Sequence, residues 1–230
     1  MIFKWLRRGL LGLVVLVLGY QLWIFAHVWW WVDHNPANSA FMEERLNRLQ
    51  ENNSDAALRH KWVPYSQISG NLKRALVAAE DAHFLSHDGF DWEGIQLAAE
   101  KNLKKGKIVA GGSTISQQLA KNLFLSGSRT PWRKLEEALI TVMIEQMMSK
   151  RRILEIYMNV IEWGNGVFGA NAAAHYYYRV SQASLSASQA AKLAAMVPNP
   201  RFYDTHRNAR GLLRRAAIIQ SRMAQAAVPR

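Results

Sequence analysis

The sequence predicts a mainly α-helical protein that carries one membrane-spanning helix at its N-terminus. The first observation behind this fold class is a nearly uninterrupted apolar run from residue 9 to residue 32. The second is the helical spacing of apolar residues in most of the later segments. The third is that no internal repeat, low-complexity segment or convincing strand-like alternation is found, so nothing in the pattern favours a sheet.

Length, cysteine count and net charge limit the functions that this chain can have. The chain has 230 residues and leaves roughly 200 for a folded domain, which is enough for a real core. It contains no cysteine, which excludes disulfides and thiolate chemistry. The 29 basic and 17 acidic residues give a net charge of +12. Such a charge suits nucleic acid, an anionic membrane surface or a polyanionic substrate such as a pyrophosphate, and it does not distinguish among them.

The N-terminal segment predicts a retained membrane anchor. Residues 1–8 contain three cations and are expected to be cytoplasmic, while residues 9–32 are long enough to span a bilayer. Trp23 and Trp29–Trp31 gather toward the far end, as in an interfacial aromatic belt. A cleaved signal peptide is the alternative, but its apolar region would be shorter, about 7–15 residues. The anchor places the domain outside the cytoplasm and argues against a nucleic-acid partner.

Residues 33–61 are predicted to form a juxtamembrane stalk with a polar helix, and residues 62–230 the main domain. Pro64 favours an extended joint at the start of that domain. Ser66 or Ser69 is expected to cap the helix that follows.

The first informative motif ends that helix. Glu80 and Asp81 follow an apolar stripe over residues 71–79, and His83, Phe84 and His87 come next. Carboxylates at the negative end of a helix dipole are locally unfavourable, which is typical of functional sites. Burial beside the apolar stripe would raise the pKa of Glu80 toward the range useful for proton transfer. The alternative is a solvated acidic pair that simply ends a helix.

A second motif lies in residues 110–122. Two glycines precede Ser113 and Thr114, either of which can cap a new helix. Thr114, Gln118 and Lys121 share one face of that helix, where a hydroxyl, an amide and an ammonium could bind a sugar or a phosphate. The alternative is a capped surface helix. Phe124 and Leu125 are expected to be exposed and to reach the bilayer.

The remaining segments are expected to be helical. Residues 92–103 predict a helix with Ile95, Ala98 or Ala99, and Leu103 inward. The lysines after it predict a solvated face or a contact with lipid head groups. Residues 131–147 predict a helix whose core stripe comprises Leu135, Leu139, Val142, Met143 and Met147. Further helices are expected over residues 150–159, 167–178 and 186–197, and from Asp204 or Thr205 to about residue 226.

Two charged features accompany these helices. Arg133 and Glu137 are four residues apart and can form an ion pair on one helix face. Lys150 opens a helix with three adjacent cations, an arrangement that the helix dipole disfavours and that a bound anion would stabilise.

Taken together, the motifs resemble those of the monofunctional peptidoglycan glycosyltransferases, the family that also supplies the transferase domain of bifunctional penicillin-binding proteins. The resemblance covers about residues 62–200. It is carried by Glu80-Asp81 with Phe84, His87 and Gly89-Phe90-Asp91; by Gly112-Ser113-Thr114-Ile115 with Gln117-Gln118-Leu119 and Lys121-Asn122; by Arg133-Lys134 with Glu137; and by Lys150 with Ile153-Leu154, Tyr157 and Asn159. Gln189 departs from the glutamate common in the family and is expected to be structural. No serine-x-x-lysine motif supports a transpeptidase.

The resemblance implies a lysozyme-like, two-lobed helical transferase domain whose smaller lobe lies partly in the membrane. It implies that the chain polymerises lipid II into β-1,4-linked glycan strands by inverting glycosyl transfer, with release of undecaprenyl pyrophosphate. Glu80 would be the general base on the acceptor hydroxyl, and Glu137 would assist at the donor site. The implied substrate contacts are Asp81, Phe84, His87, Ser113, Thr114, Gln118, Lys121, Arg133 and Lys150, with Lys121, Arg133 and Lys150 on the leaving pyrophosphate.

The resemblance implies no obligatory cofactor and leaves open a divalent cation such as Mg²⁺ at the pyrophosphate. No protein metal site is predicted, because the His83 and His87 pair lacks a third ligand at a telling spacing. The implied partners are the growing glycan chain, membrane lipids and other cell-wall synthesis or division proteins. The implied location is the bacterial inner membrane, with the catalytic domain in the periplasm.

The residue chemistry agrees with such a transfer. A pyrophosphate is a good leaving group, so the reaction needs a base on the acceptor and cations on the departing charge. A glycoside hydrolase would instead need a carboxylic acid to protonate a poor leaving oxygen. Two alternatives remain, a lysozyme-like glycan-cleaving enzyme with Glu80 as the acid and a non-catalytic membrane scaffold.

Overall fold

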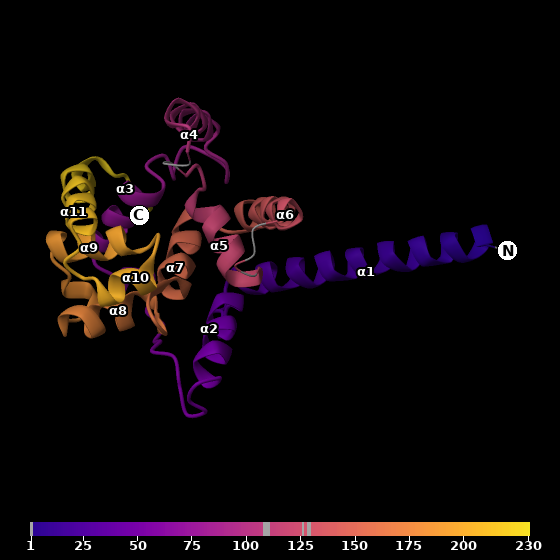
Figure 1. Ribbon diagram of the computed structural model, residues 1–230, viewed down its shortest axis with the longest axis horizontal. Coiled ribbons are helices and arrows are strands. Elements are labelled where there is room, and N and C mark those ends of the chain that lie inside the picture. The colour runs from indigo at the N-terminus through magenta and orange to yellow at the C-terminus, as the bar shows by residue number, and fades with distance from the viewer. Residues whose placement is uncertain (1, 108–110, 126, 128–129) are drawn as a thin grey trace.

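A single long helix, α1 (Ile2–Trp30), projects from the rest of the molecule, with the N-terminus at its free end (Figure 1). The computed structural model describes residues 2–107, 111–125, 127 and 130–230. Helix α1 has 29 residues, a length of about 44 Å, and its most apolar window has a mean hydropathy of 2.1. It therefore fits the predicted single-pass membrane anchor by length and composition.

The last turns of α1 are packed against the folded domain. Ile24 and Val28 are fully buried in the main hydrophobic core. The ring of Phe124 lies 6.0 Å from Trp23 and 5.2 Å from Trp31, centroid to centroid. The prediction that Phe124 and Leu125 reach the bilayer is therefore wrong in part, because Phe124 covers the anchor helix and Leu125 is buried. Anchor and domain form one continuous packing unit.

Helices make up most of the described chain after α1. The elements are α2 (Ala40–Gln50), η1 (Tyr65–Gln67), α3 (Gly70–Glu80), α4 (Trp92–Lys105), α5 (Ile115–Phe124), α6 (Pro131–Met147), α7 (Lys150–Val160), β1 (Glu162–Gly164), β2 (Val167–Phe168), α8 (Gly169–Tyr178), η2 (Gln182–Ser184), α9 (Ala187–Met196), α10 (Pro200–Thr205), α11 (Arg210–Arg222) and η3 (Met223–Gln225). The predicted mainly α fold is confirmed.

The helices form two groups joined by α7 (Figure 1). In one group α3 and α11 both pack on α9, and in the other α5 packs on α6 and on α7. Helix α2 packs on α5, with Met42 buried in the contact. Side chains cap many of these helices: Ser69 accepts from Asn71 N at α3, and Thr114 accepts from Gln117 N at α5. The site described below lies where α3, α5 and α11 meet.

Two predicted helix boundaries are wrong. The segment expected to be helical from residue 167 begins with β2, which pairs antiparallel with β1 around the turn at Gly166 (φ 73°). A positive φ suits glycine, so this turn closes a short hairpin that local periodicity did not reveal. The helix expected from Asp204 onward is two helices, because α10 ends at Thr205 and α11 begins at Arg210.

Two predicted core faces are wrong in part. In α6 the buried residues are Glu137, Ile140, Thr141 and Ile144, whereas Leu135, Leu139 and Val142 are about half exposed. Met143 and Met147 of the predicted stripe do pack against the core. In α4 Ala98 is buried as expected, but Leu103 is 85% exposed. Both helices carry apolar side chains on two faces, and only their neighbours decide which face turns inward. The other face remains available at the surface.

Candidate active site

Glu80 is the last residue of α3, and its side chain is nearly enclosed, with only 10% of its surface exposed. Its Oε2 accepts a hydrogen bond from Gln118 Nε2 at 2.9 Å, and its Oε1 accepts one from Arg215 Nη2 at 3.1 Å. Burial raises the pKa of Glu80 above the usual value for glutamate, and it outweighs the lowering by Gln118 and by the cations Arg215 and Lys121. A carboxylate with such a pKa is suited to proton transfer.

Gln118 is itself held in place by Tyr157 of α7. The Tyr157 hydroxyl donates to Gln118 Oε1 at 2.8 Å, so the amide nitrogen of Gln118 is directed to Glu80. Tyr157 is fully buried, and burial together with the charges of Glu80 and Asp81 raises its pKa well above the usual value. The phenol therefore remains protonated and fixes the orientation of the amide.

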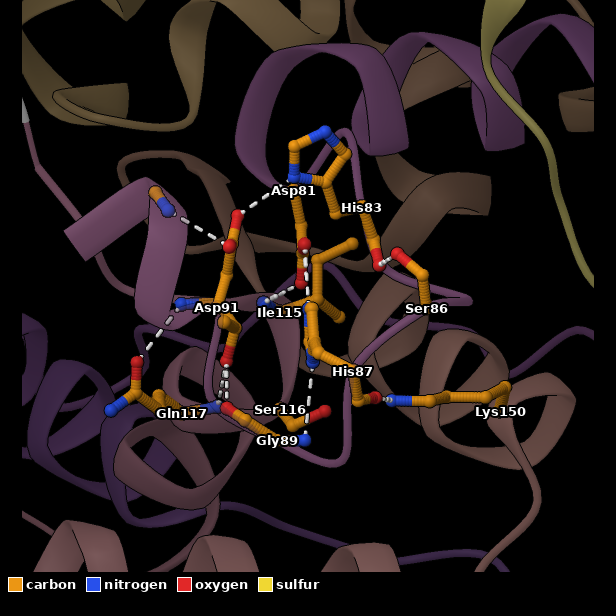
Figure 2. A network of polar contacts seen from close by, with 12 residues as sticks. Asp81, His83, Ser86, His87, Gly89, Asp91, Ile115, Ser116, Gln117 and Lys150 are labelled. Atoms are coloured by element: carbon orange, nitrogen blue, oxygen red, sulfur yellow. Dashed lines mark hydrogen bonds and ion pairs between the residues drawn. The ribbon is translucent and has the colours of Figure 1, made fainter. Parts of the chain in front are cut away.

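Asp81 ties the loop after α3 to the start of α5 (Figure 2). Its Oδ1 accepts from His87 Nε2 at 2.9 Å, and its Oδ2 accepts from Ile115 N at 2.9 Å. Gly89 N donates to His87 Nδ1 at 3.1 Å, so the ring proton lies on Nε2 and points to Asp81. The positive φ of Gly89, 92°, permits this tight turn.

Other residues predicted to bind substrate also have partners inside the protein. Thr114 Oγ1 donates to Gly89 O at 2.6 Å and, as the cap of α5, accepts from Gln117 N at 3.2 Å. Lys150 Nζ donates to His87 O at 2.6 Å (Figure 2) and to Glu145 at 2.8 Å. Phe84 is fully buried beneath the Lys150 ammonium. These contacts hold the loop against α5 and α7, and direct substrate contact by Asp81, Phe84, His87, Thr114 and Lys150 stays a prediction.

Glu137 lies on the inward face of α6 between two cations. Its Oε2 accepts from Arg133 Nη1 at 2.9 Å, which confirms the ion pair expected from their spacing. Its Oε1 pairs with Lys134, which also donates to the exposed Ser113 Oγ at 3.4 Å. The buried carboxylate therefore fixes two basic side chains near the glycine-rich turn.

Two cavities flank this arrangement. A cavity of about 160 Å³ is lined by Glu80 together with Asp81, Asp91, Gly112, Ser113 and Thr114, among others. A larger one of about 320 Å³ is lined by Gln118 together with Lys121, Arg133, Asn199 and Arg201, among others. The hydrogen-bonded pair Glu80–Gln118 joins the two, because each cavity is lined by one member of it. A base and a basic cavity thus lie side by side.

The charge state of Lys121 supports an anion in the larger cavity. Burial lowers the pKa of Lys121. The neighbouring cations Arg133 and Lys134 lower this pKa further, whereas the carboxylates Glu137 and Glu80 raise it. An arriving diphosphate would stabilise the protonated ammonium and the neighbouring guanidinium together.

The two histidines of the first motif do not converge. His83 Nδ1 lies 3.1 Å from Asp91 Oδ2, whereas His87 contacts Asp81. Within the described residues, no group of three or more His, Asp or Glu side chains is placed to hold a metal ion.

Sequence reasoning missed two residues of the site and underused a third. Arg215 is 135 residues from Glu80 in the chain, and no local signal marks it within the basic helix α11. Sequence reasoning assigned no role to Glu145, which pairs with Lys150. Lys134 belongs to the third motif but received no role of its own, although its spacing of three from Glu137 predicts the contact.

The fold and the site define a class. A helical domain behind a helix long enough to span a membrane places a buried glutamate beside a basic cavity. These are the base and the cations that glycosyl transfer from a diphosphate donor requires. Residues 45–224 match the family described as Transglycosylase. The chain belongs to this transglycosylase family, which confirms the resemblance drawn from the motifs.

Individual relatives agree along almost the whole chain. The "Biosynthetic peptidoglycan transglycosylase" of Methylobacillus flagellatus is 69% identical over 96% of this chain and 97% of its own length. Proteins of the same name from Laribacter hongkongensis and Thiobacillus denitrificans are 68% and 62% identical; they are matched over 98% and 100% of this chain and over 99% of their own lengths.

Proposed function

We propose that this chain polymerises lipid II into β-1,4-linked glycan strands, with inversion at the donor and release of undecaprenyl pyrophosphate, in bacterial cell-wall synthesis. Family membership and the names of the relatives support this reaction class. The observation that carries it is the buried Glu80, fixed by Gln118 beside a cavity lined by Lys121 and Arg133. This is the combination of one base and several cations that expulsion of a pyrophosphate requires.

In this proposal Glu80 is the general base. Its carboxylate removes the proton from the 4-hydroxyl of the acceptor sugar, and the resulting oxygen attacks the anomeric carbon of the donor. The bond from that carbon to the pyrophosphate oxygen breaks, and the electron pair leaves with the pyrophosphate. The raised pKa of Glu80 improves its match to the pKa range in which general bases work best.

The departing charge is stabilised by Lys121 and Arg133, with Lys134 close to Ser113 at the same side of the site. Arginine suits this task because its guanidinium can donate two parallel hydrogen bonds to phosphate oxygens. Glu137 binds two of the cations and keeps them in position before substrate arrives. Its assistance at the donor site is then indirect, through the side chains that it orients.

A divalent ion such as Mg²⁺ fits these residues poorly. Glu162 lines the basic cavity and already pairs with Arg45. Both oxygens of Glu137 contact the neighbouring cations Arg133 and Lys134. A bound ion would have to displace a basic side chain from one of these two carboxylates. We therefore propose that protein cations alone neutralise the leaving group.

One observation favours a second candidate, a glycan-cleaving enzyme. A glutamate whose pKa is raised by burial could serve as the general acid of a hydrolase. Arg215 argues against this assignment, because a guanidinium at 3.1 Å favours the ionised carboxylate.

The position of α6 along the length of α1 supports contact of α6 with membrane lipids. Helices α1 and α6 pack together, and the Tyr20 hydroxyl of α1 lies close to the Glu136 carboxylate of α6. Only twelve residues, about 18 Å of helix, separate Tyr20 from Arg8, which is less than the roughly 30 Å of a bilayer core. If Arg8 lies at the inner surface, the exposed apolar residues of α6 lie at lipid depth: Trp132, Leu135, Leu139 and Val142. A substrate with a lipid tail can enter the site from that side.

We extend the proposal to the inner membrane with the domain in the periplasm, from the cations before α1 and the aromatic residues after it. The growing glycan chain would be the second ligand of the site. Protein partners in elongation or division remain an expectation from the family.

The test is polymerisation of labelled lipid II by the detergent-solubilised full chain. We expect high-molecular-weight glycan, digestible by lysozyme, from the wild type and from Glu93→Gln, an exposed control on α4. Glu80→Gln should lose at least about 100-fold in rate, because general base catalysis typically contributes that much. Polymer from Glu80→Gln at the wild-type rate would remove Glu80 from its role. Soluble fragments released from finished cell wall, with no use of lipid II, would establish the glycan cleaver instead.

A further inference from the structure

Helix α11 reaches the site through one side chain, Arg215. Its Nη2 donates to Oε1 of Glu80 at 3.1 Å, across 135 residues of sequence. The other carboxylate oxygen, Oε2, accepts from Gln118. Both oxygens of the proposed base therefore have a hydrogen-bond donor in the structure. Each oxygen can still accept a second hydrogen bond, but release of its donor makes that oxygen more accessible and more basic toward the acceptor hydroxyl.

The two donors differ in how easily they can leave. Gln118 is fixed from behind by the fully buried Tyr157, so moving it would strand a buried hydroxyl. The Arg215 side chain is 41% exposed. A long, partly exposed side chain can turn its charge into solvent at little cost. Oε1 is thus the oxygen that can be vacated.

The backbone beneath Arg215 is firmly placed. Leu212, Ala216 and Ile219 bury the opposite face of α11, which packs on α9 and α3. Glu80 is the last residue of α3. The guanidinium can therefore swing away and return without any movement of the helix that carries it.

We infer that Arg215 is a positioning residue for the general base: it holds Oε1 of Glu80 in the substrate-free protein and yields that oxygen to the acceptor hydroxyl. This inference rests on the proposed transferase function and deepens it. It assigns a role in the reaction to the C-terminal helix, which lies outside the four motifs identified in the sequence.

The charges that face Glu80 define how the removal of Arg215 should act. They are Arg215 from α11 and Lys121 from α5, with Tyr157 of α7 and the adjacent Asp81 also close. Burial raises the pKa of Glu80, and the two cations lower it. Without Arg215 the pKa of Glu80 rises further, so the carboxylate stays protonated, and inactive as a base, up to a higher pH. At alkaline pH it is ionised again, and its Oε1 is already free.

The experiment compares kcat and KM for lipid II polymerisation between pH 5.5 and 9.5 in the full-length protein. The variants are Arg215→Gln, Arg215→Lys and the control Arg214→Gln, an exposed neighbour on the same helix. For Arg215→Gln we expect the acid limb of kcat to move to higher pH, with roughly tenfold loss at pH 6 from the missing charged partner. At pH 9 its kcat should equal or exceed that of the wild type. Arg215→Lys should keep the wild-type profile within about threefold, because it retains the charge.

Two outcomes would overturn the inference while leaving the proposed function intact. A loss of kcat that is equal at every pH would indicate a structural role, and thermal unfolding of each variant would reveal it directly. A profile identical to that of Arg214→Gln would show that the contact does not act on the base. If the wild type itself makes no polymer, the proposed function fails, and this inference fails with it. Polymer from the wild type and none from Glu80→Gln upholds the proposed function whatever Arg215→Gln does.

Discussion

At the scale of single residues, the site depends on how Glu80 is held rather than on its presence alone. Its two oxygens have different donors, one from a buried pair and one from a partly exposed arginine. Burial raises the pKa of the carboxyl, and the surrounding hydrogen bonds and cations moderate the shift. The geometry and the charge state of the base are therefore set by the same contacts.

Tyr157→Phe tests the buried half of this arrangement. The change removes the hydroxyl that orients Gln118 and leaves the Gln118 carbonyl without that donor. We expect kcat to fall by about tenfold, with a stability loss of about 1–3 kcal/mol, the usual cost of an unsatisfied buried polar group. Tyr178→Phe, at the edge of the core on α8, serves as the control and should change kcat less than twofold. Unchanged kcat in Tyr157→Phe would show that Gln118 needs no such support.

At the scale of elements, the loop after α3 is fastened to the N-terminus of α5 by a charged side chain. Asp81 accepts from the backbone of Ile115 and from His87, and Lys150 binds the same loop from α7. An acceptor at a helix N-terminus satisfies a free N–H group and interacts favourably with the dipole. This fastening brings Glu80 of one helix against Gln118 of another.

Asp81→Asn tests that fastening. The amide can accept only one of the two hydrogen bonds and directs an N–H group at the other donor. We expect about 2–3 kcal/mol of lost stability, typical of a broken buried charged hydrogen bond, and a clear fall in the thermal midpoint. Asp88→Asn, exposed in the same loop, is the matched control and should unfold like the wild type. Equal midpoints for both variants would contradict the role given to Asp81.

At the scale of the whole molecule, the anchor and the catalytic domain form one body. Ile24 and Val28 of α1 belong to the main core, and Arg152 of α7 donates to the backbone oxygens of Trp31 and His34 just after α1. Helix α1 is therefore fixed in its orientation relative to the domain. Figure 1 shows α6 beside the base of α1, which is the side from which a lipid-linked substrate approaches in the function proposed above.

Leu139→Lys tests the membrane-facing assignment of α6. Leu139 is 46% exposed, and Leu213 on α11 is 45% exposed, so Leu213→Lys is a closely matched control. A lysine at the centre of the bilayer costs about 2.5–3.5 kcal/mol. We expect polymerisation of lipid II in liposomes to fall at least about tenfold for Leu139→Lys, with near-normal activity in detergent. Equal activity of the two variants in liposomes would place this face of α6 in water.

Much of the helical framework and the identity of the central glutamate could be predicted from the sequence. Apolar spacing marked most helices, and the caps Ser69 and Thr114 were each one of two candidates. Glu80 was predicted as a site residue because two carboxylates end an apolar helix. These features are encoded within one or two helical turns, so the chain displays them locally. The membrane anchor is likewise a local property, since length and hydropathy suffice to recognise it.

The tertiary structure alone decided which faces were buried and which side chains met. The outward apolar face of α6 was not predicted, because contacts with neighbouring elements decide which of two similarly hydrophobic faces is buried. The short hairpin of β1 and β2 was not predicted either. The contact of Arg215 with Glu80 could not be predicted from the sequence, because it forms only when α11 and α3 pack on α9. Sequence determined the anchor, the helices and the chemical groups of this protein. Packing between distant segments determined which of those groups could act together.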